Sequence, residues 1–152
     1  DFSKPVKNGP NINGFDRYYG HCGSLDMAPY VWVDTGKVTA LPDRQEGVSK
    51  SQNRYGWYRK GPIGSDFHID EVLPHLFDKG MAYVKERAKT KKPFFLYLPH
   101  TAVHLPLVPG KKFKGTSQGG AYGDWVQEID WSMGELFKTL NCLNRQVYCK
   151  IF

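Results

Sequence analysis

The sequence has few cysteines and no long apolar run, and these two shortages narrow the class of protein. It contains three cysteines in 152 residues and no C-x-x-C pair, which argues against a zinc site and against a full disulfide framework. No apolar run approaches the roughly 20 residues that a membrane-spanning helix needs, so no membrane span is predicted. Hydrophobic residues make up 40% of the chain and charged residues 24%, which excludes wholesale disorder.

Acidic residues are fewer than basic ones. The chain has 21 Lys and Arg against 15 Asp and Glu, a formal net charge of +6. Such a balance suits a nucleic acid, an anionic membrane surface or an anionic substrate. The positive charge is densest at residues 85–92 and 111–114. The first stretch ends a predicted helix, where cations complement the helix dipole. Because no zinc-finger, RRM or helix-turn-helix signature is present, no nucleic-acid partner is predicted.

Periodic patterns are scarce in the first 65 residues, which are rich in Gly, Pro, Asn and Tyr. The alternation of aromatic and β-branched residues at 28–33 predicts a short strand. Residues 41–65 contain two prolines and four glycines, and we expect them to form a long loop.

Two amphipathic helices are predicted in the second half of the chain. Apolar residues recur at spacings of three and four from residue 69 to about 89, and again from about 122 to 140. Pro74 falls in the first turns of the earlier helix, where proline is tolerated. Gly134 is expected to allow close packing of the later helix. The apolar positions are Val72, Leu73, Leu76, Phe77, Met81, Val84 and Ala88 in the first helix, and Val126, Ile129, Met133, Leu136, Phe137 and Leu140 in the second.

Five consecutive bulky apolar residues stand between Pro93 and Pro99. The run is too short for a helix and predicts a strand covered on both faces, as in a parallel sheet. Helix, strand, loop and helix form one repeat of an α/β fold. We therefore predict the α/β class, with a mostly parallel central sheet flanked by helices.

Two histidines, His100 and His104, follow this predicted strand. Ligands of open α/β sheets bind beyond the carboxyl ends of the strands. An imidazole there can hydrogen-bond an anionic oxygen, or donate a proton to a leaving oxygen near neutral pH. The alternative is that either histidine merely caps the strand end. Prolines on both sides argue against the helical zinc site that an i,i+4 pair of histidines otherwise indicates.

Six segments carry distinctive motifs: residues 8–10, 14–20, 24–30, 93–109, 120–124 and 128–134. The segment 93–109, which contains His104-Leu105-Pro106, resembles the strand and His-x-Pro motif of sulfatases of the arylsulfatase type. The other segments resemble further parts of that family, in the same order along the chain. The resemblance covers about residues 1–140 and implies part of an alkaline-phosphatase-like sulfatase sandwich, incomplete here.

The resemblance implies hydrolysis of sulfate esters. Sulfatases use a formylglycine hydrate made from Cys or Ser in a C/S-x-P-S-R motif, a calcium ion, and Lys and His side chains that neutralise the sulfate. His104, in His-Leu-Pro, matches the family histidine that contacts the sulfate and assists the leaving group, and is the catalytic candidate. Ser24 matches a position near the substrate, Asp26 lies beside it, and His100 is a further candidate for lining the pocket. Apart from the resemblance, Ser24 and Asp26 suit a turn in which they bond local backbone.

The sequence lacks several parts that this family uses. It has no C/S-x-P-S-R motif, no early Asp-Asp calcium pair, no Gly-Lys-Trp-His segment and no Ser-Asp-Asn-Gly motif. We therefore expect no metal ligands in this chain and no sulfatase activity of the chain alone. Residues 1–140 are expected to be a partial sulfatase catalytic domain, internal to a longer protein, and residues 141–152 a divergent C-terminal tail.

A second function stands beside the enzymatic one: a non-catalytic binding module for sulfated glycans or other polyanions, motivated by the net charge and the two lysine-rich stretches. Under either function the expected partner is a sulfate-ester small molecule or a sulfated glycan. The resemblance implies a periplasmic or secreted location for the parent family. Whether Cys142 and Cys149 pair stays open.

Overall fold

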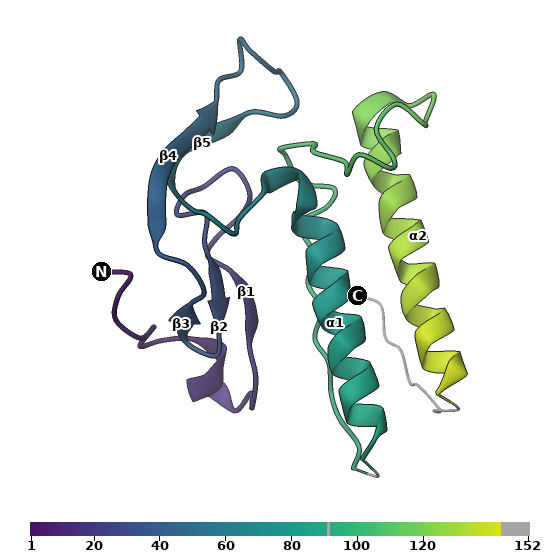
Figure 1. The fold of residues 1–152 in the computed structure, drawn as a ribbon. Coiled ribbons are helices and arrows are strands. Elements are labelled where there is room, and N and C mark those ends of the chain that lie inside the picture. The colour runs from purple at the N-terminus through teal and green to yellow at the C-terminus, as the bar shows by residue number, and fades with distance from the viewer. Residues whose placement is uncertain (91, 144–152) are drawn as a thin grey trace.

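The computed structural model describes residues 1–90 and 92–143. Figure 1 shows the β-strands on one side of the molecule and two long helices lying side by side on the other. The elements in chain order, with 3-10 helices labelled η, are η1 (Pro10–Asn13), β1 (Tyr19–His21), β2 (Trp32–Asp34), β3 (Lys37–Val38), β4 (Pro42–Val48), β5 (Tyr58–Gly64), η2 (Ile69–Glu71), α1 (Val72–Ala88) and α2 (Gly120–Cys142).

The described strands form two antiparallel sheets. One has the order β1-β2-β3, and the other is the hairpin of β4 and β5. A parallel bridge between Tyr30 and Ile63 joins the segment before β2 to β5. The strand predicted at 28–33 is confirmed only at Trp32 and Val33, which begin β2.

The prediction of a long loop at residues 41–65 is wrong, because most of that segment forms β4 and β5. Pro42 is the first residue of β4, a position where proline is tolerated in a strand. The pairing shifts register between Pro42 and Arg44 and between Glu46 and Val48, as β-bulges do. Because bulges and glycines interrupt the two-residue alternation, the sequence pattern does not reveal these strands.

Both predicted helices are confirmed. α1 buries the stripe that its periodicity predicts, and Pro74 is its third residue, where it removes no helical hydrogen bond. α2 buries Trp125, Leu136 and Leu140. Gly134 does not serve close packing, since a Cβ there would meet no atom within 4 Å. Within residues 1–90 and 92–143, no helix combines the length and the apolar character that crossing a membrane requires.

Aromatic side chains fix the three-stranded sheet against α1. The ring of Trp32 lies 4.8 Å from that of Phe67 and 4.7 Å from that of His75, measured between centroids. The hydroxyl of Tyr19 lies 2.7 Å from Nε2 of His75. Burial lowers the pKa of His75, which favours the neutral ring in this stack. Burying a large aromatic side chain contributes roughly 1.5–3 kcal/mol, so this cluster is a main link between sheet and helix.

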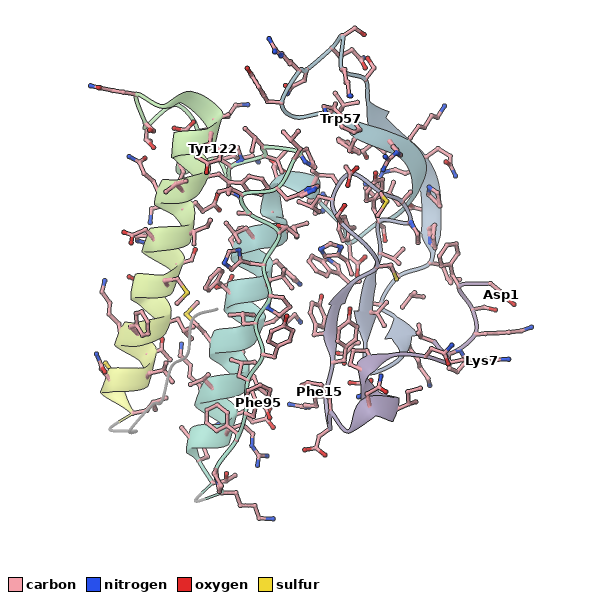
Figure 2. The ribbon with its side chains drawn as sticks, turned by 180° about the vertical axis from the view of Figure 1, so that it is seen from behind. Asp1, Lys7, Phe15, Trp57, Phe95 and Tyr122 are labelled. Atoms are coloured by element: carbon pink, nitrogen blue, oxygen red, sulfur yellow. The ribbon has the colours of Figure 1, made fainter. Side chains whose placement is uncertain are left out.

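Residues 93–99 run extended along α1, but they pair with no strand in the part of the chain that the structure describes (Figure 1). Leu96 and Leu98 pack on the core, next to Gly80 of α1. On the opposite face Phe95 is 74% exposed and Tyr97 is 64% exposed. The ring of Phe95 lies near that of Phe15, which comes from a distant part of the sequence, as Figure 2 shows.

The prediction of a strand covered on both faces is therefore wrong for the described residues. The mostly parallel central sheet is likewise not found in them, since both sheets that they form are antiparallel. The physical reason is that a central parallel strand needs a hydrogen-bonded neighbour on each edge, and the segment 93–99 has neither here. The α/β class itself fits, because the helices pack on the strand-bearing half.

Two buried carboxylates of α2 hold the loop that precedes this helix. Asp124 accepts hydrogen bonds from the backbone N–H groups of Gly115 at 2.8 Å and Ser117 at 2.7 Å, and these bonds lower its pKa. Glu128 accepts one from Gly110 at 2.8 Å, while burial raises the pKa of this carboxyl. The loop carrying the second lysine-rich stretch is thus tied to the first turns of α2.

The close approach of β5 to the segment before β2 generates a prediction. A Cβ on Gly61 would lie against the Cβ of Ala28, far inside van der Waals contact. Gly61→Ala should therefore destabilise the fold by about 1–3 kcal/mol, the usual cost of overpacking, as measured by urea denaturation. The matched control is Gly134→Ala, which adds the same methyl group in open space and should stabilise α2 by up to about 1 kcal/mol. Equal stability of the two variants would contradict the described contact.

Candidate active site

Ser24 and Asp26 lie in the segment between β1 and β2. The hydroxyl of Ser24 donates a short hydrogen bond to Oδ1 of Asp26, and the N–H of Met27 bonds to the Ser24 carbonyl at 3.0 Å. The turn chemistry that suits these residue types is therefore present. This turn occupies only Oδ1 of the Asp26 carboxylate. The other oxygen, Oδ2, bonds a partner on another element.

That partner is Arg59 of β5, a residue that no sequence motif singled out. Its Nη1 donates to Oδ2 of Asp26 at 2.8 Å, and the backbone N–H of Arg59 donates to the Asp26 carbonyl at 3.2 Å. The hydroxyl of Tyr30 donates to the carbonyl of Arg59 at 2.8 Å. The Asp26 residue is 9% exposed, whereas the Arg59 side chain is 57% exposed. The ion pair thus has a buried anion and a cation that reaches solvent.

The surroundings of Asp26 keep it ionised. The hydrogen bond from Ser24 is the largest of the influences that lower the pKa of this carboxyl, and the charges of Arg59 and His104 act in the same direction against the opposing effect of burial. Of the four predicted site residues, the structure links Ser24 and Asp26 by a hydrogen bond, and it adds Arg59 as a partner of Asp26. The grouping of His104 with them stays a prediction.

His104 is held in a defined orientation within an exposed turn. Its Nδ1 lies 2.6 Å from the carbonyl oxygen of Leu105, and its backbone N–H donates to the carbonyl of Thr101 at 3.1 Å. A carbonyl only accepts, so Nδ1 carries the proton of this hydrogen bond and Nε2 is the atom left for a ligand. Cis peptide bonds precede Val103 and Pro106 in this turn.

His100 lies beside α1. Its ring is 6.0 Å from that of Phe77, a buried residue of α1, measured between centroids. No contact with Ser24, Asp26 or His104 is found for it among the described residues. Its assignment to the pocket stays a prediction.

A cavity of about 290 Å³ lies between the β4–β5 hairpin and residues 67–70. Arg44, Glu46 and Tyr58 line it, and the Tyr58 hydroxyl donates to Oε1 of Glu46 at 2.6 Å. None of the four predicted site residues lines this cavity. The candidate site is instead an open surface around Nε2 of His104.

The residues present do not fit the calcium ion that the resemblance implies. In residues 1–90 and 92–143, no group of three His, Cys, Asp or Glu side chains is placed to hold a metal ion. Asp26, the best candidate oxygen ligand, already binds Ser24 and Arg59. Cys22 and Cys142 stand in no C/S-x-P-S-R motif, so neither fits the formylglycine precursor. The chemistry assigned to the described residues therefore involves neither group.

Comparisons with known proteins agree with this description. No family model matches the chain. The N-acetylgalactosamine-6-sulfatase of Homo sapiens is 35% identical over 136 residues, which cover 89% of this chain and 24% of the relative. The N-acetylgalactosamine-6-O-sulfatase of Bacteroides thetaiotaomicron is 26% identical over 177 residues, covering 94% of this chain and 34% of the relative. The chain thus spans about a quarter to a third of the length of these relatives.

A solved structure supports the same grouping. It is a sulfatase from work on glycosaminoglycan metabolism by Bacteroides thetaiotaomicron, and it matches with a TM-score of 0.76 and 23% identity, over 95% of this chain and 36% of the other. At this identity the likeness shows the fold. The sequence relatives are themselves named as sulfatases. The chain belongs to the sulfatase family, and the resemblance read from its motifs is confirmed.

The ion pair of Asp26 and Arg59 generates a second prediction. Asp26→Asn should lower the free energy of unfolding at pH 7 by roughly 1–2 kcal/mol, the scale of a hydrogen bond to a charged group. Since the folded carboxyl has a lowered pKa, its stabilisation is fully present above the ordinary Asp pKa near 4 and is lost as the pH falls through the lowered value. Denaturation curves from pH 7 to pH 3 should show the gap between wild type and variant closing below about pH 4.

The matched control is Asp16→Asn, because Asp16 is exposed. This variant should track the wild type at every pH. A gap for Asp26→Asn that stays constant down to pH 3 would count against an ionised Asp26 in the folded chain.

Proposed function

We propose that this chain contributes one wall of a sulfate-ester hydrolase site, with His104 as the group that contacts the ester and protonates its leaving oxygen. The observation that carries the proposal is the orientation of His104, whose Nδ1 is occupied by the Leu105 carbonyl and whose Nε2 is available. Membership of the sulfatase family supports the reaction class.

The step assigned to His104 is a proton transfer. In the imidazolium form the Nε2–H donates its proton to the bridging ester oxygen as the sulfur–oxygen bond breaks, leaving a neutral ring and an alcohol. Asp26, whose pKa is lowered chiefly by the hydrogen bond from Ser24, adds a negative charge to the proposed site. Arg59 acts as a positioning residue, because it holds the Asp26 carboxylate through Nη1. The attacking nucleophile is not supplied by the described residues.

The substrate that fits best is a sulfated amino sugar. The relatives that cover most of the chain carry names specifying sulfate at O6 of N-acetylgalactosamine, and we infer the same kind of ester here. Formylglycine and calcium would belong to the complete catalytic domain, of which this chain forms a part. The purified chain alone should not turn over an aryl sulfate in the presence of calcium.

Binding at His104 tests the proposal without requiring turnover. The chain labelled at its histidines should show a shift of the His104 ring signals on titration with N-acetylgalactosamine 6-sulfate, measured by NMR. Unsulfated N-acetylgalactosamine is the matched ligand control and should leave them unchanged. His104→Gln should abolish the response of neighbouring backbone signals, whereas His68→Gln, at an exposed histidine outside the four predicted site residues, should preserve it.

Two results would contradict the proposal. One is an equal response to the sulfated and the unsulfated sugar. The other is a response that survives in His104→Gln. Turnover of an aryl sulfate by the chain alone would separately overturn the expectation that it is inactive.

The alternative function, a non-catalytic polyanion-binding module, stays a prediction. Of the second lysine-rich stretch, Lys112 is drawn back onto α2, with its Nζ 3.4 Å from the ring centroid of Trp131. Lys111 and Lys114 are exposed. Loss of heparin binding in Lys111→Glu with Lys112→Glu would support this alternative, and unchanged binding would count against it.

A further inference from the structure

The connection between β4 and β5 is basic and carries no acidic side chain. Between Glu46 and Asp66 the sequence has neither Asp nor Glu. The four cationic side chains of residues 47–65, two in the connection and two in β5, are exposed. A short exposed segment with charges of one sign creates a local potential that attracts polyanions. The four cations are Lys50, Arg54, Arg59 and Lys60.

Aromatic rings hold three of these cations in place. Nζ of Lys50 lies 4.5 Å from the centroid of the Trp57 ring, and the guanidinium carbon of Arg59 lies 5.9 Å from the same centroid. The guanidinium of Arg54 lies 5.4 Å from the ring of Tyr55. Such cation–π contacts orient the cation. A side chain that is already oriented loses less entropy when it binds an anion.

Residues 49–57, here called the hairpin tip, are connected to the segment that carries His104. The Tyr55 carbonyl accepts a hydrogen bond of 2.6 Å from the N–H of Leu107, three residues beyond His104. Arg59 adds a second connection, because it bonds Asp26 and also lies near Trp57. Figure 2 shows Trp57 at the same end of the molecule as Tyr122 of α2. The hairpin tip is therefore connected to the segment that follows His104 and, through Arg59, to Asp26.

We propose that the hairpin tip binds a sulfated glycan chain and presents it to the His104 site. Lys50 and Arg54 pair with sulfate groups of the chain, while Tyr55, which is 52% exposed, and Trp57 offer flat apolar faces to the sugar rings. The inference rests on the proposed function and extends it, from a single sulfate ester at His104 to a polymer that continues across the hairpin tip.

A nucleic acid is the competing polyanion, since aromatic rings interleaved with cations also suit stacked bases. One feature favours the glycan. The hairpin tip is connected through Leu107 and Arg59 to segments of a site whose proposed ligand is a sulfate ester. Binding of DNA is therefore a result that the test must be able to detect.

The test measures binding of the 152-residue chain to a chondroitin 6-sulfate oligosaccharide by calorimetry at low salt. The Lys50→Glu, Arg54→Glu double variant should weaken binding about tenfold or more, because two attractive charges become repulsive. The matched control is the Lys85→Glu, Lys89→Glu double variant. It changes the net charge equally at the far end of α1, where both lysines are exposed. This control should weaken binding less than about twofold, as screening limits charges beyond a Debye length.

Two comparisons separate a specific surface from general electrostatics. Trp57→Leu should weaken binding of the oligosaccharide, and Trp57→Phe should restore most of it, because phenylalanine keeps an aromatic face. Hyaluronan, which carries carboxylates but no sulfate, should bind weakly to the wild type. The proposal is overturned if both double variants lose affinity equally, or if single-stranded DNA of equal charge binds as tightly with the same dependence on Trp57.

The two proposals fail in different ways. The hairpin double variant should still show the His104 response to N-acetylgalactosamine 6-sulfate, whereas His104→Gln should still bind the oligosaccharide. If only the His104 response to N-acetylgalactosamine 6-sulfate is absent, the proposed function is contradicted. If only the dependence of oligosaccharide binding on the hairpin charges is absent, the role of the hairpin tip is contradicted.

Discussion

The contact on which the site depends is the one between Asp26 and Arg59. It joins a turn of the segment before β2 to β5, which belongs to the other sheet. Four hydrogen bonds fix the two segments against each other: two from Nη1 of Arg59, one from its backbone N–H and one from the Tyr30 hydroxyl. Gly61 leaves no space for a side chain against Ala28. Charge and close packing thus fix the position of the Asp26 carboxylate.

The sequence predicted those features that a local pattern encodes. The spacing of Leu73, Leu76 and Phe77 is enough to identify α1, since a helix buries its own stripe regardless of what covers it. Ser24, Asp26 and His104 were found through motifs that resemble a family, and the structure links Ser24 to Asp26 by a hydrogen bond. The family was identified from the matching segments between residues 8 and 134, and the relatives confirm it.

Features that depend on distant partners could not be predicted in this way. Arg59 lies 33 residues from Asp26, inside a segment whose bulges erase the alternation of a strand. The run 93–99 has the composition of a buried strand. Whether such a run is covered depends on neighbours at its edges, and composition carries no information about these. Gly134 is a second example of a feature that the sequence alone does not determine. Its residue type suggested a close contact, but its surroundings are open.

The extended run beside α1 has a further consequence for how the chain behaves in water. Its leucines are packed on the core, yet its amide groups form no ladder with any strand that the structure describes. Side-chain burial and backbone protection, which usually accompany each other in a sheet, are separated here. Amide hydrogens of residues 94–98 should therefore exchange with solvent deuterium far faster than those of α1 at similar depth. The two rates would distinguish a segment held by its side chains from one held by its backbone.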